Sequence, residues 1–328
     1  MNLEISTIRK EELSWLMQEE ANKEGWLYSE DDVNFYFNYS GNQISAIKVN
    51  GELAGCVLLH SSLGNMQGMP IRSAGFFLVI EKFRGQKIVG PYLWQNTITA
   101  NTNKNMLVCF HSVPRAVGFY EQLGFLKTPL INIFYALDVS KVNHDQLKTI
   151  IPIIQEGSLR KIETTHLSDI ETYNKKLFTD TSGAGFRDFI HHWLQRSDAI
   201  IFAYYEQGIV KGYGVLTVTQ KIDQEDTITL CYRLSPLYAD SVEIAGFILK
   251  ALVSFALQEH AQRIELSSLA DSGTEFTQLL AQIGFTACGK NYVVSNHSDM
   301  IDKNNSILNK VYSSLPLEYP HEVIGGLI

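Results

Sequence analysis

Residues 75–94, GFFLVIEKFRGQKIVGPYLW, combine an apolar strand, a basic turn with a glycine and the start of a helix. Backbone N–H groups in such a turn and in the first helical turn have no internal partner, and the helix dipole adds partial positive charge there. Pro91 fits that first turn because no N–H partner is needed at its position. Arg84 and Lys87 would add charge-assisted contacts to a diphosphate. The segment therefore predicts a phosphate-binding strand–turn–helix unit, and an ordinary strand-to-helix turn remains the alternative.

A second informative segment, residues 114–125, PRAVGFYEQLGF, predicts a helix that carries Tyr120 and ends at Gly124 before the next strand. Its pattern A-x-x-x-Y-E-x-x-G-F resembles the later helix of GCN5-related N-acetyltransferases (GNAT). The basic turn in residues 84–90 resembles the R-x-x-G-x-G/A loop with which that family binds acetyl-CoA. Residues 19–26, EEANKEGW, resemble a substrate-side segment of a GNAT subfamily that has two such domains in tandem.

The chain shows signs of an internal duplication. A hairpin pattern at residues 43–58 recurs at residues 200–216, where the paired glycines are offset by 157 positions. The Gly124-Phe125 ending of the tyrosine helix recurs at an offset of 160 as Gly284-Phe285. Residues 232–240, YRLSPLYAD, resemble the C-terminal domain of the same tandem subfamily. Two features that share nearly one offset indicate two copies of one fold.

We therefore predict an α/β protein with an α+β mixed sheet, made of two tandem GNAT-like domains. Each would have a central, mostly antiparallel twisted sheet flanked by helices. Residues 1–140 would form the first domain, which binds acetyl-CoA, and residues 141–158 would connect it to a degenerate second domain at 159–328. The tail from residue 297 contains prolines and a glycine pair, which favours extended structure packed on the body.

The second half departs from the family pattern in two places, and both indicate that it has lost catalysis. After its strand at 227–234 it has Ser235-Pro236-Leu237 in place of a basic glycine loop. Leu280 stands where the first half has Tyr120. We therefore expect any chemistry in the first half.

For the first half, the resemblance implies that an amine attacks the thioester of acetyl-CoA directly. The strand at 73–80 would offer the backbone N–H of Val79 to the thioester oxygen. Tyr120 would protonate the departing thiolate as general acid. That strand has no carboxylate to serve as base, so a water relay is one alternative. His111, at the end of the neighbouring strand, is another, against the reading of an ordinary packed or surface histidine.

The resemblance also implies a set of residues that contact the CoA moiety. Lys87 and Val89 stand at the two family glycine positions, and β-branched residues do not readily take a positive φ, so the loop should differ in shape and bind CoA less tightly. Val113 replaces the asparagine that usually precedes the tyrosine helix. The predicted CoA-binding residues are Leu78, Val79, Arg84, Gly85, Gln86, Lys87, Ile88, Val89, Gly90 and Tyr120.

Through the same resemblance, Glu24 and Trp26 would line the acceptor side of the site. A solvated glutamate and a core tryptophan explain these two residues equally well, so both interpretations stay open. The overall charge bears on the acceptor, because 27 basic against 35 acidic residues leave the chain at −8. Such a balance does not favour the broad basic surface that nucleic acid or anionic lipid requires, whereas a cationic small molecule is compatible with it.

Other sequence features narrow the class of protein. No apolar run has the length of a membrane span, and the polar start does not resemble a signal peptide, so we expect a cytoplasmic protein without membrane association. Four scattered cysteines favour reduced thiols, with no disulfide framework and no metal site.

The function we expect is acetyl transfer from acetyl-CoA to a primary amine of a small molecule or peptide, in a monomer or homodimer. An acyl- or aminoacyl-transferase of the same fold is one alternative. A CoA-binding protein without catalysis is the other.

Overall fold

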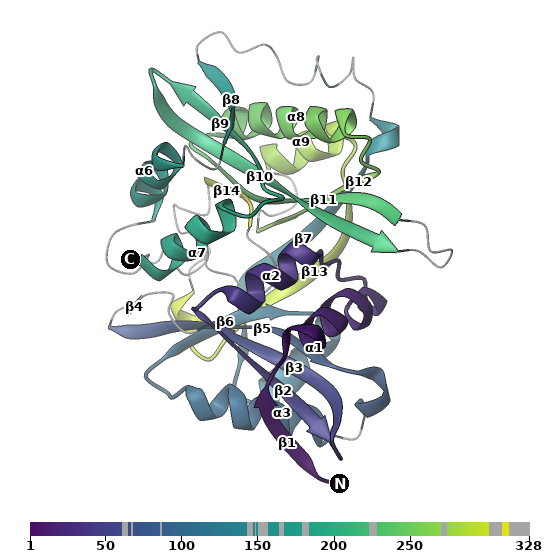
Figure 1. The fold of residues 1–328 in the computed structure, drawn as a ribbon. Coiled ribbons are helices and arrows are strands. Elements are labelled where there is room, and N and C mark those ends of the chain that lie inside the picture. The colour runs from purple at the N-terminus through teal and green to yellow at the C-terminus, as the bar shows by residue number, and fades with distance from the viewer. Residues whose placement is uncertain are drawn as a thin grey trace.

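One continuous mixed sheet runs through the protein and carries helices on its faces (Figure 1). Its strand order is β1-β2-β3-β5-β6-β13-β7-β12-β11-β10-β9-β8, with β4 paired to β5 and β14 to β11. The mixed α/β class and the tandem arrangement expected from the sequence are confirmed. The two expected sheets are joined edge to edge into one. The computed structural model describes residues 1–60, 65–66, 68–85, 87–142, 147, 149, 157–163, 167–178, 184–222, 228–269, 274–301 and 310–314.

The first half contributes strands in which apolar residues alternate with polar ones or run continuously where both faces are covered. The first-half strands are β1 (Leu3–Thr7), β2 (Asn42–Val49), β3 (Glu52–His60), β4 (Asn65–Met66), β5 (Met69–Val79), β6 (Leu107–Ser112) and β7 (Leu126–Asp138). Its helices are α1 (Lys10–Trp15), continued by a π turn (Leu16–Glu20) and a 3-10 turn (Asn22–Glu24), then α2 (Glu30–Asn38), α3 (Val89–Thr97) and α4 (Val117–Gln122). Short 3-10 turns occupy Glu81–Phe83, Thr99–Asn101, Pro114–Ala116 and Val139–Lys141.

The second half repeats the order of hairpin, long strand, helix, strand, helix and final strand. Its strands are β8 (Ser158–Ile162), β9 (Ile200–Glu206), β10 (Ile209–Ile222), β11 (Ile228–Ala239), β12 (Arg263–Ser268), β13 (Thr286–Ser295) and β14 (Val311–Ser313). Its helices are α6 (Ser168–Leu177), α7 (Ala184–Leu194), α8 (Val242–Gln258), α9 (Glu275–Ile283) and a 3-10 turn (Ser298–Met300). The strand predicted to end at 234 is longer than expected, and Ser235-Pro236-Leu237 lies inside it.

The duplicated glycines occupy equivalent places in the two halves. Gly55 on β3 lies opposite Val79 at the end of β5, and Gly212 on β10 lies opposite Ala239 at the end of β11. A Cβ on Gly55 would lie 2.1 Å from the carbonyl oxygen of Leu78, and one on Gly212 would lie 2.8 Å from that of Tyr238. Both positions therefore exclude any side chain, which explains why the duplication preserves glycine there.

The two halves exchange a strand where they meet. β13, from the second half, lies between β6 and β7 of the first half, and β7 in turn pairs with β12 of the second half (Figure 1). The backbone hydrogen bonds of β6 and β7 in the first half are therefore completed by β13. Most of the predicted connector at 141–158 lies outside the described residues.

A buried ion cluster adds to the contact between the halves. Asp32 on α2 is fully buried and accepts from the guanidinium groups of Arg196, at 2.6 Å, and Arg233, at 3.2 Å. Burial by itself would raise the pKa of Asp32, but the two arginines outweigh it and hold the pKa below its ordinary value. Removal of either partner would leave a buried charge uncompensated.

Other sequence expectations can be compared directly with the structure. Cys56, Cys109 and Cys231 are buried and Cys288 is exposed, and all four are free thiols. Of the described tail, Val311–Ser313 is extended and packed, as expected, whereas Ser298–Met300 forms a 3-10 turn that was not expected. No helix in the described part of the chain is long and apolar enough to cross a membrane. The described residues also contain no group of three or more His, Cys, Asp or Glu side chains placed to hold a metal ion.

Candidate active site

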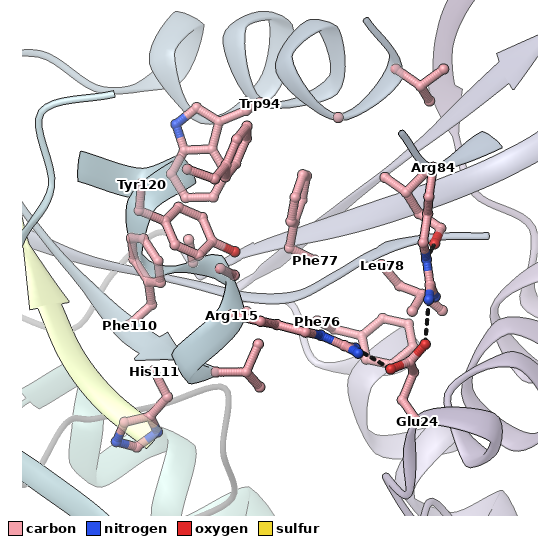
Figure 2. Close-up of a pocket in the computed structure, with 18 of the residues that line it drawn as sticks. Glu24, Phe76, Phe77, Leu78, Arg84, Trp94, Phe110, His111, Arg115 and Tyr120 are labelled. Atoms are coloured by element: carbon pink, nitrogen blue, oxygen red, sulfur yellow. Dashed lines mark hydrogen bonds and ion pairs between the residues drawn. The ribbon is translucent and has the colours of Figure 1, made fainter. Parts of the chain in front are cut away.

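The candidate active site lies where two parallel strands of the first half separate. β5 and β6 pair only from Ile71 with Leu107 to Ser73 with Cys109, and both strands continue beyond that point. A cavity of about 560 Å³ opens between the diverging ends (Figure 2). The predicted residues that line it are Glu24, Trp26, Leu78, Val79, Arg84, Gly85, Lys87, Val89, Gly90, His111 and Tyr120. Of the other two, Ile88 is exposed and does not line the cavity, and Gln86 lies outside the described residues.

Val79 directs its backbone polar groups toward the open side of β5. It faces Gly55 across the ladder, and the N–H of Ile80 donates to the carbonyl of Ala54 at 2.9 Å. In an antiparallel pair, that bond makes Val79 and Gly55 the non-hydrogen-bonded pair, so the N–H and C=O of Val79 point away from β3. The neighbouring residue Leu78 alternates and points its backbone groups at β3. The backbone N–H of Val79, the residue that the sequence predicted as oxyanion donor, therefore faces the cavity.

A β-bulge precedes Val79 and shapes the wall of the cavity. Phe76 and Phe77 together oppose the single residue Val57, because the register shifts between Cys56 and Leu58. Phe76 has a φ of 43°, which is uncommon for a bulky residue. Phe77 lies on the side of Trp94 and Tyr120 (Figure 2). Phe76 packs edge-on against Trp26 and Tyr28. The bulge thus provides an aromatic wall on each side of the strand.

The loop after β5 takes two left-handed backbone conformations. Its positive φ angles fall on Gly85 at 77° and Lys87 at 54°, so neither Ile88 nor Val89 needs a left-handed conformation. α3 then begins at Val89 without a side-chain cap on its N-terminal N–H groups. A Cβ on Gly90 would lie 3.6 Å from Phe77 and 3.8 Å from Val79, so the first turn of α3 packs on the opened strand. The uncapped helix start and the basic loop form one rim of the cavity.

Tyr120 lies on α4 in the aromatic wall opposite that rim. Its ring centroid is 4.6 Å from that of Phe110 and 5.1 Å from that of Trp94. Figure 2 shows its hydroxyl pointing into the cavity. Burial raises the pKa of the phenol well above its ordinary value, so the group carries its proton at neutral pH. A protonated hydroxyl at this place can act as a general acid.

Glu24 lies across the mouth of the cavity between two arginines. Its carboxylate accepts from Arg84, in the loop after β5, and from Arg115, in the turn after β6 (Figure 2). Arg84 also donates from Nε to the carbonyl of Val79 at 2.6 Å. Burial raises the pKa of Glu24, but the hydrogen bonds from the two guanidinium groups outweigh it and the pKa lies below its ordinary value.

Sequence reasoning missed Arg115, although it stands within the tyrosine motif segment. His111 lies on β6 opposite Val293 of β13 and lines the cavity, so the structure brings it to the site. Its two interpretations, as a base and as a packed histidine, both remain compatible with that position. Trp26 packs edge-on against Phe76, with ring centroids 6.3 Å apart, and lines the cavity as well.

A second cavity of about 400 Å³ adjoins the first at the junction of the two halves. Its second-half lining includes Arg233, Glu265 and Ser267. The residues common to both cavities are Glu24, Trp26, Tyr28, Val113 and Asn291. Asn291 comes from the exchanged strand β13, which no motif in the first half could have indicated. A molecule in the second cavity would therefore reach the opened strand past Glu24 and Trp26.

The equivalent separation in the second half is filled by the chain itself. β11 and β12 pair in parallel from Cys231 with Arg263 to Leu234 with Leu266. Beyond that point β14 pairs with β11, so that Val311 lies opposite Tyr238. On the other side, the N–H of Ser314 donates to the carbonyl of Ser267 at 2.9 Å. The tail thus bridges the two strands that diverge.

Comparison with known proteins places these features in context. A family model described as an acetyltransferase (GNAT) domain matches residues 176–309. A putative acetyltransferase from Pyrococcus horikoshii is 13% identical, with a TM-score of 0.65 over 96% of this chain and 95% of that one. A tandem GNAT protein from the clavulanic acid biosynthesis pathway is 14% identical, with a TM-score of 0.67 over 90% and 98%.

Saccharomyces cerevisiae N-myristoyltransferase with bound myristoyl-CoA is 10% identical, with a TM-score of 0.64 over 96% of this chain and 85% of that one. No curated protein sequence matches the chain significantly. The family model falls on the second half, whereas the sequence motifs and the open cavity lie in the first. The likeness to the solved structures spans both halves and shows the tandem fold.

Proposed function

Because residues 176–309 match the GNAT domain family and the whole chain has the tandem GNAT fold, we propose that the protein transfers an acetyl group from acetyl-CoA to a primary amine. The observation that carries the proposal is the backbone N–H of Val79, which faces the cavity between β5 and β6. The chemistry takes place in the first half. The acceptor is a small molecule or peptide whose amine enters from the adjoining cavity.

Three features of the cavity support acetyl-CoA as the donor. Lys87 and the uncapped start of α3 offer positive charge and free N–H groups to the diphosphate. Pantetheine lies along the open edge of β5, where main-chain groups bind it as an added strand would. Its thioester then reaches the zone between Val79 and Tyr120. In the second half, β14 occupies the equivalent strand edge.

Each residue has a defined part in the transfer. The acceptor ammonium first gives one proton to a base or to water, and the neutral amine nitrogen then forms a bond to the thioester carbon. The N–H of Val79 stabilises the oxygen that becomes negative. The C–S bond breaks, and the thiolate takes the proton of Tyr120. The second proton lost by the nitrogen returns to the phenolate through water, so amide, CoA thiol and one released proton are the products.

A screen of primary amines with detection of the free CoA thiol tests the proposal. We expect turnover with a subset of amines and a loss of about 10²–10³-fold in kcat for Tyr120→Phe, because a positioned general acid contributes about that factor. Binding of acetyl-CoA should be kept in this variant. Tyr232→Phe is the matched control, since it removes the same hydroxyl from β11 of the second half, and its kcat should stay close to wild type.

Three outcomes would each contradict a part of the proposal. A kcat of Tyr120→Phe equal to that of wild type would show that Tyr120 is not the general acid. Binding of acetyl-CoA without thiol release for any amine would favour a CoA-binding protein without catalysis. Turnover with a longer acyl-CoA or an aminoacyl donor, and none with acetyl-CoA, would mean that the same site uses a different donor.

A further inference from the structure

Glu24 is the one acidic side chain among the described residues that line the cavity. It is paired with two arginines, one after each of the two diverging strands. Arg84 follows β5 and Arg115 follows β6, so the three residues span the opening between the diverging strands (Figure 2). Only 13% of the Glu24 side chain is exposed, compared with 36% for Arg84 and 69% for Arg115. The least exposed member of the bridge is therefore the carboxylate.

From this bridge we propose that Glu24 holds the place of a CoA phosphate and is released when CoA binds. The diphosphate takes over Arg84, and the freed carboxylate then accepts a proton from the ammonium group of the acceptor. This inference rests on the function proposed above and deepens it, because it names an order of binding and a cationic acceptor. Acyl-CoA binds first, and only then does the base become available.

The geometry supports the exchange of partners. Arg84 lies in the basic loop itself, next to Gly85 and close to the uncapped start of α3, where the diphosphate would bind. A diphosphate carries more negative charge than one carboxylate and accepts a bidentate guanidinium contact, so it competes for Arg84 effectively. Arg115 belongs to the other side of the opening and can remain with Glu24 or move to solvent.

The position of Glu24 also suits a base. Arg84 touches the carbonyl of Val79 with Nε and the carboxylate of Glu24 with another guanidinium nitrogen. One guanidinium group therefore separates Glu24 from the strand edge at which the thioester carbonyl would bind. Glu24 also lines the adjoining cavity, from which the acceptor approaches. With both arginines bound its proton affinity is low, and loss of Arg84 raises it.

The proton step is balanced without a further reactant. The N–H bond of the ammonium breaks, and the proton binds a carboxylate oxygen of Glu24. The neutral amine then attacks, and Glu24 later gives the proton to solvent. The charged groups that face Glu24 in the described structure are Arg84 and Arg115. A neutral acceptor would need no such base.

Calorimetric titration of acetyl-CoA into the whole chain tests the exchange. Glu24→Gln keeps the shape of the side chain and weakens its hold on Arg84, so we expect acetyl-CoA to bind about fivefold more tightly than to wild type. At the same time kcat should fall about 10²-fold and lose its dependence on an acidic pKa. Glu24→Asp, which is too short to reach both arginines, should bind acetyl-CoA with intermediate affinity and keep part of the kcat.

Glu19→Gln is the matched control, because Glu19 is an exposed glutamate of the same helical segment. It should change neither acetyl-CoA affinity nor kcat. If folded Glu24→Gln and Glu24→Asp bound acetyl-CoA as tightly as wild type or more weakly, Glu24 would not hold the place of a CoA phosphate. The proposed function would stay intact. Absence of acetyl-CoA binding in wild type and in both Glu24 variants would instead overturn the proposed function, and this inference with it.

Discussion

The two halves of the chain differ at the place where two parallel strands separate. In each, a long strand pairs in parallel with the next one for three or four residues and then diverges. In the first half the diverging ends enclose a cavity. In the second half β14 lies against the end of β11, and Ser313 Oγ donates to the carbonyl of Leu234 at 2.7 Å. The fold provides the opening, and local sequence decides whether it is a site.

The helix that follows each long strand shows the same contrast. Between β5 and α3 the chain makes a basic loop, and no side chain caps the start of α3. Between β11 and α8 only Asp240 and Ser241 intervene, and the Ser241 hydroxyl accepts from the N–H of Ile244. A helix start that is capped by its own serine has less to offer a phosphate. A short connection, a serine cap and a filled strand edge therefore distinguish the second half from the first.

The filled opening can be disrupted by placing a charge on β14. Val311 is 3% exposed and pairs with Tyr238, so Val311→Asp would bury an unpaired carboxylate and lower the free energy of unfolding by about 3 kcal/mol. Because α8 stays capped, the number of acetyl-CoA sites should remain one per chain. Chemical denaturation and calorimetric titration measure these two quantities.

Ile209→Asp is the surface control for that change, since Ile209 is 60% exposed on β10. Its unfolding free energy should stay within about 0.5 kcal/mol of wild type. Appearance of a second acetyl-CoA site in Val311→Asp would show that β14 alone had closed the second half, and the short connection before α8 would then have no part in the closure.

The equivalent glycines offer a second contrast between the halves. Gly55→Ala pushes a Cβ against the carbonyl of Leu78 and should move the adjacent Val79, whereas Gly212→Ala meets Tyr238 and Ala239 in the second half. Each should lower the free energy of unfolding by about 1–3 kcal/mol, as overpacking does. Only Gly55→Ala should also lower kcat/KM, by about tenfold or more, because displacement at the reacting centre is costly. Equal kcat/KM losses in both variants would argue against Val79 as the oxyanion donor.

A smaller effect tests the contact between the halves. His60 on β3 is fully buried, stacks on Tyr39 and contacts Phe189 of α7 edge-on. Burial lowers the pKa of His60 to about 3, and the opposing influence of Asp188 does not outweigh it. Since the folded pKa lies below the unfolded value of about 6.5, the stabilisation is present above pH 6.5 and is lost as the pH falls toward 3.

Denaturation at several pH values measures this dependence. The free energy of unfolding should fall by about 1.4 kcal/mol per pH unit between pH 6 and 5, above the range in which carboxylates titrate. His60→Gln should remove that slope, whatever its effect on stability at pH 7. An unchanged slope in the variant would assign the pH dependence to other groups.

The sequence predicted the tandem fold because local signals repeat in it. Hairpin glycines, the strand–turn–helix segment and the tyrosine helix depend on neighbours within a few residues, so their pattern is visible in the chain. Most predicted site residues line one cavity for the same reason, since they flank two strands that the fold places side by side. Ile88 does not line the cavity, because it precedes α3 with its side chain exposed.

Long-range contacts account for what the sequence did not predict. The exchange of β13 depends on backbone pairing between residues that lie far apart in the chain, such as Ala136 and Thr286. The bridge from Arg84 through Glu24 to Arg115 joins three separate segments, and no spacing rule connects them. Likewise, nothing in the tail sequence showed that Val311–Ser313 would pair with β11.

Titration of acetyl-CoA into the whole chain decides whether the first half holds the CoA site. We predict one site per chain, with affinity lowered about tenfold by Arg84→Ala, because a charge-assisted contact to the diphosphate is lost. Arg160→Ala, which removes an arginine stacked on Tyr205 in the second half, should leave that affinity unchanged. Two sites per chain, no binding, or equal affinity for wild type and Arg84→Ala would contradict the assignment of the first half as the CoA site.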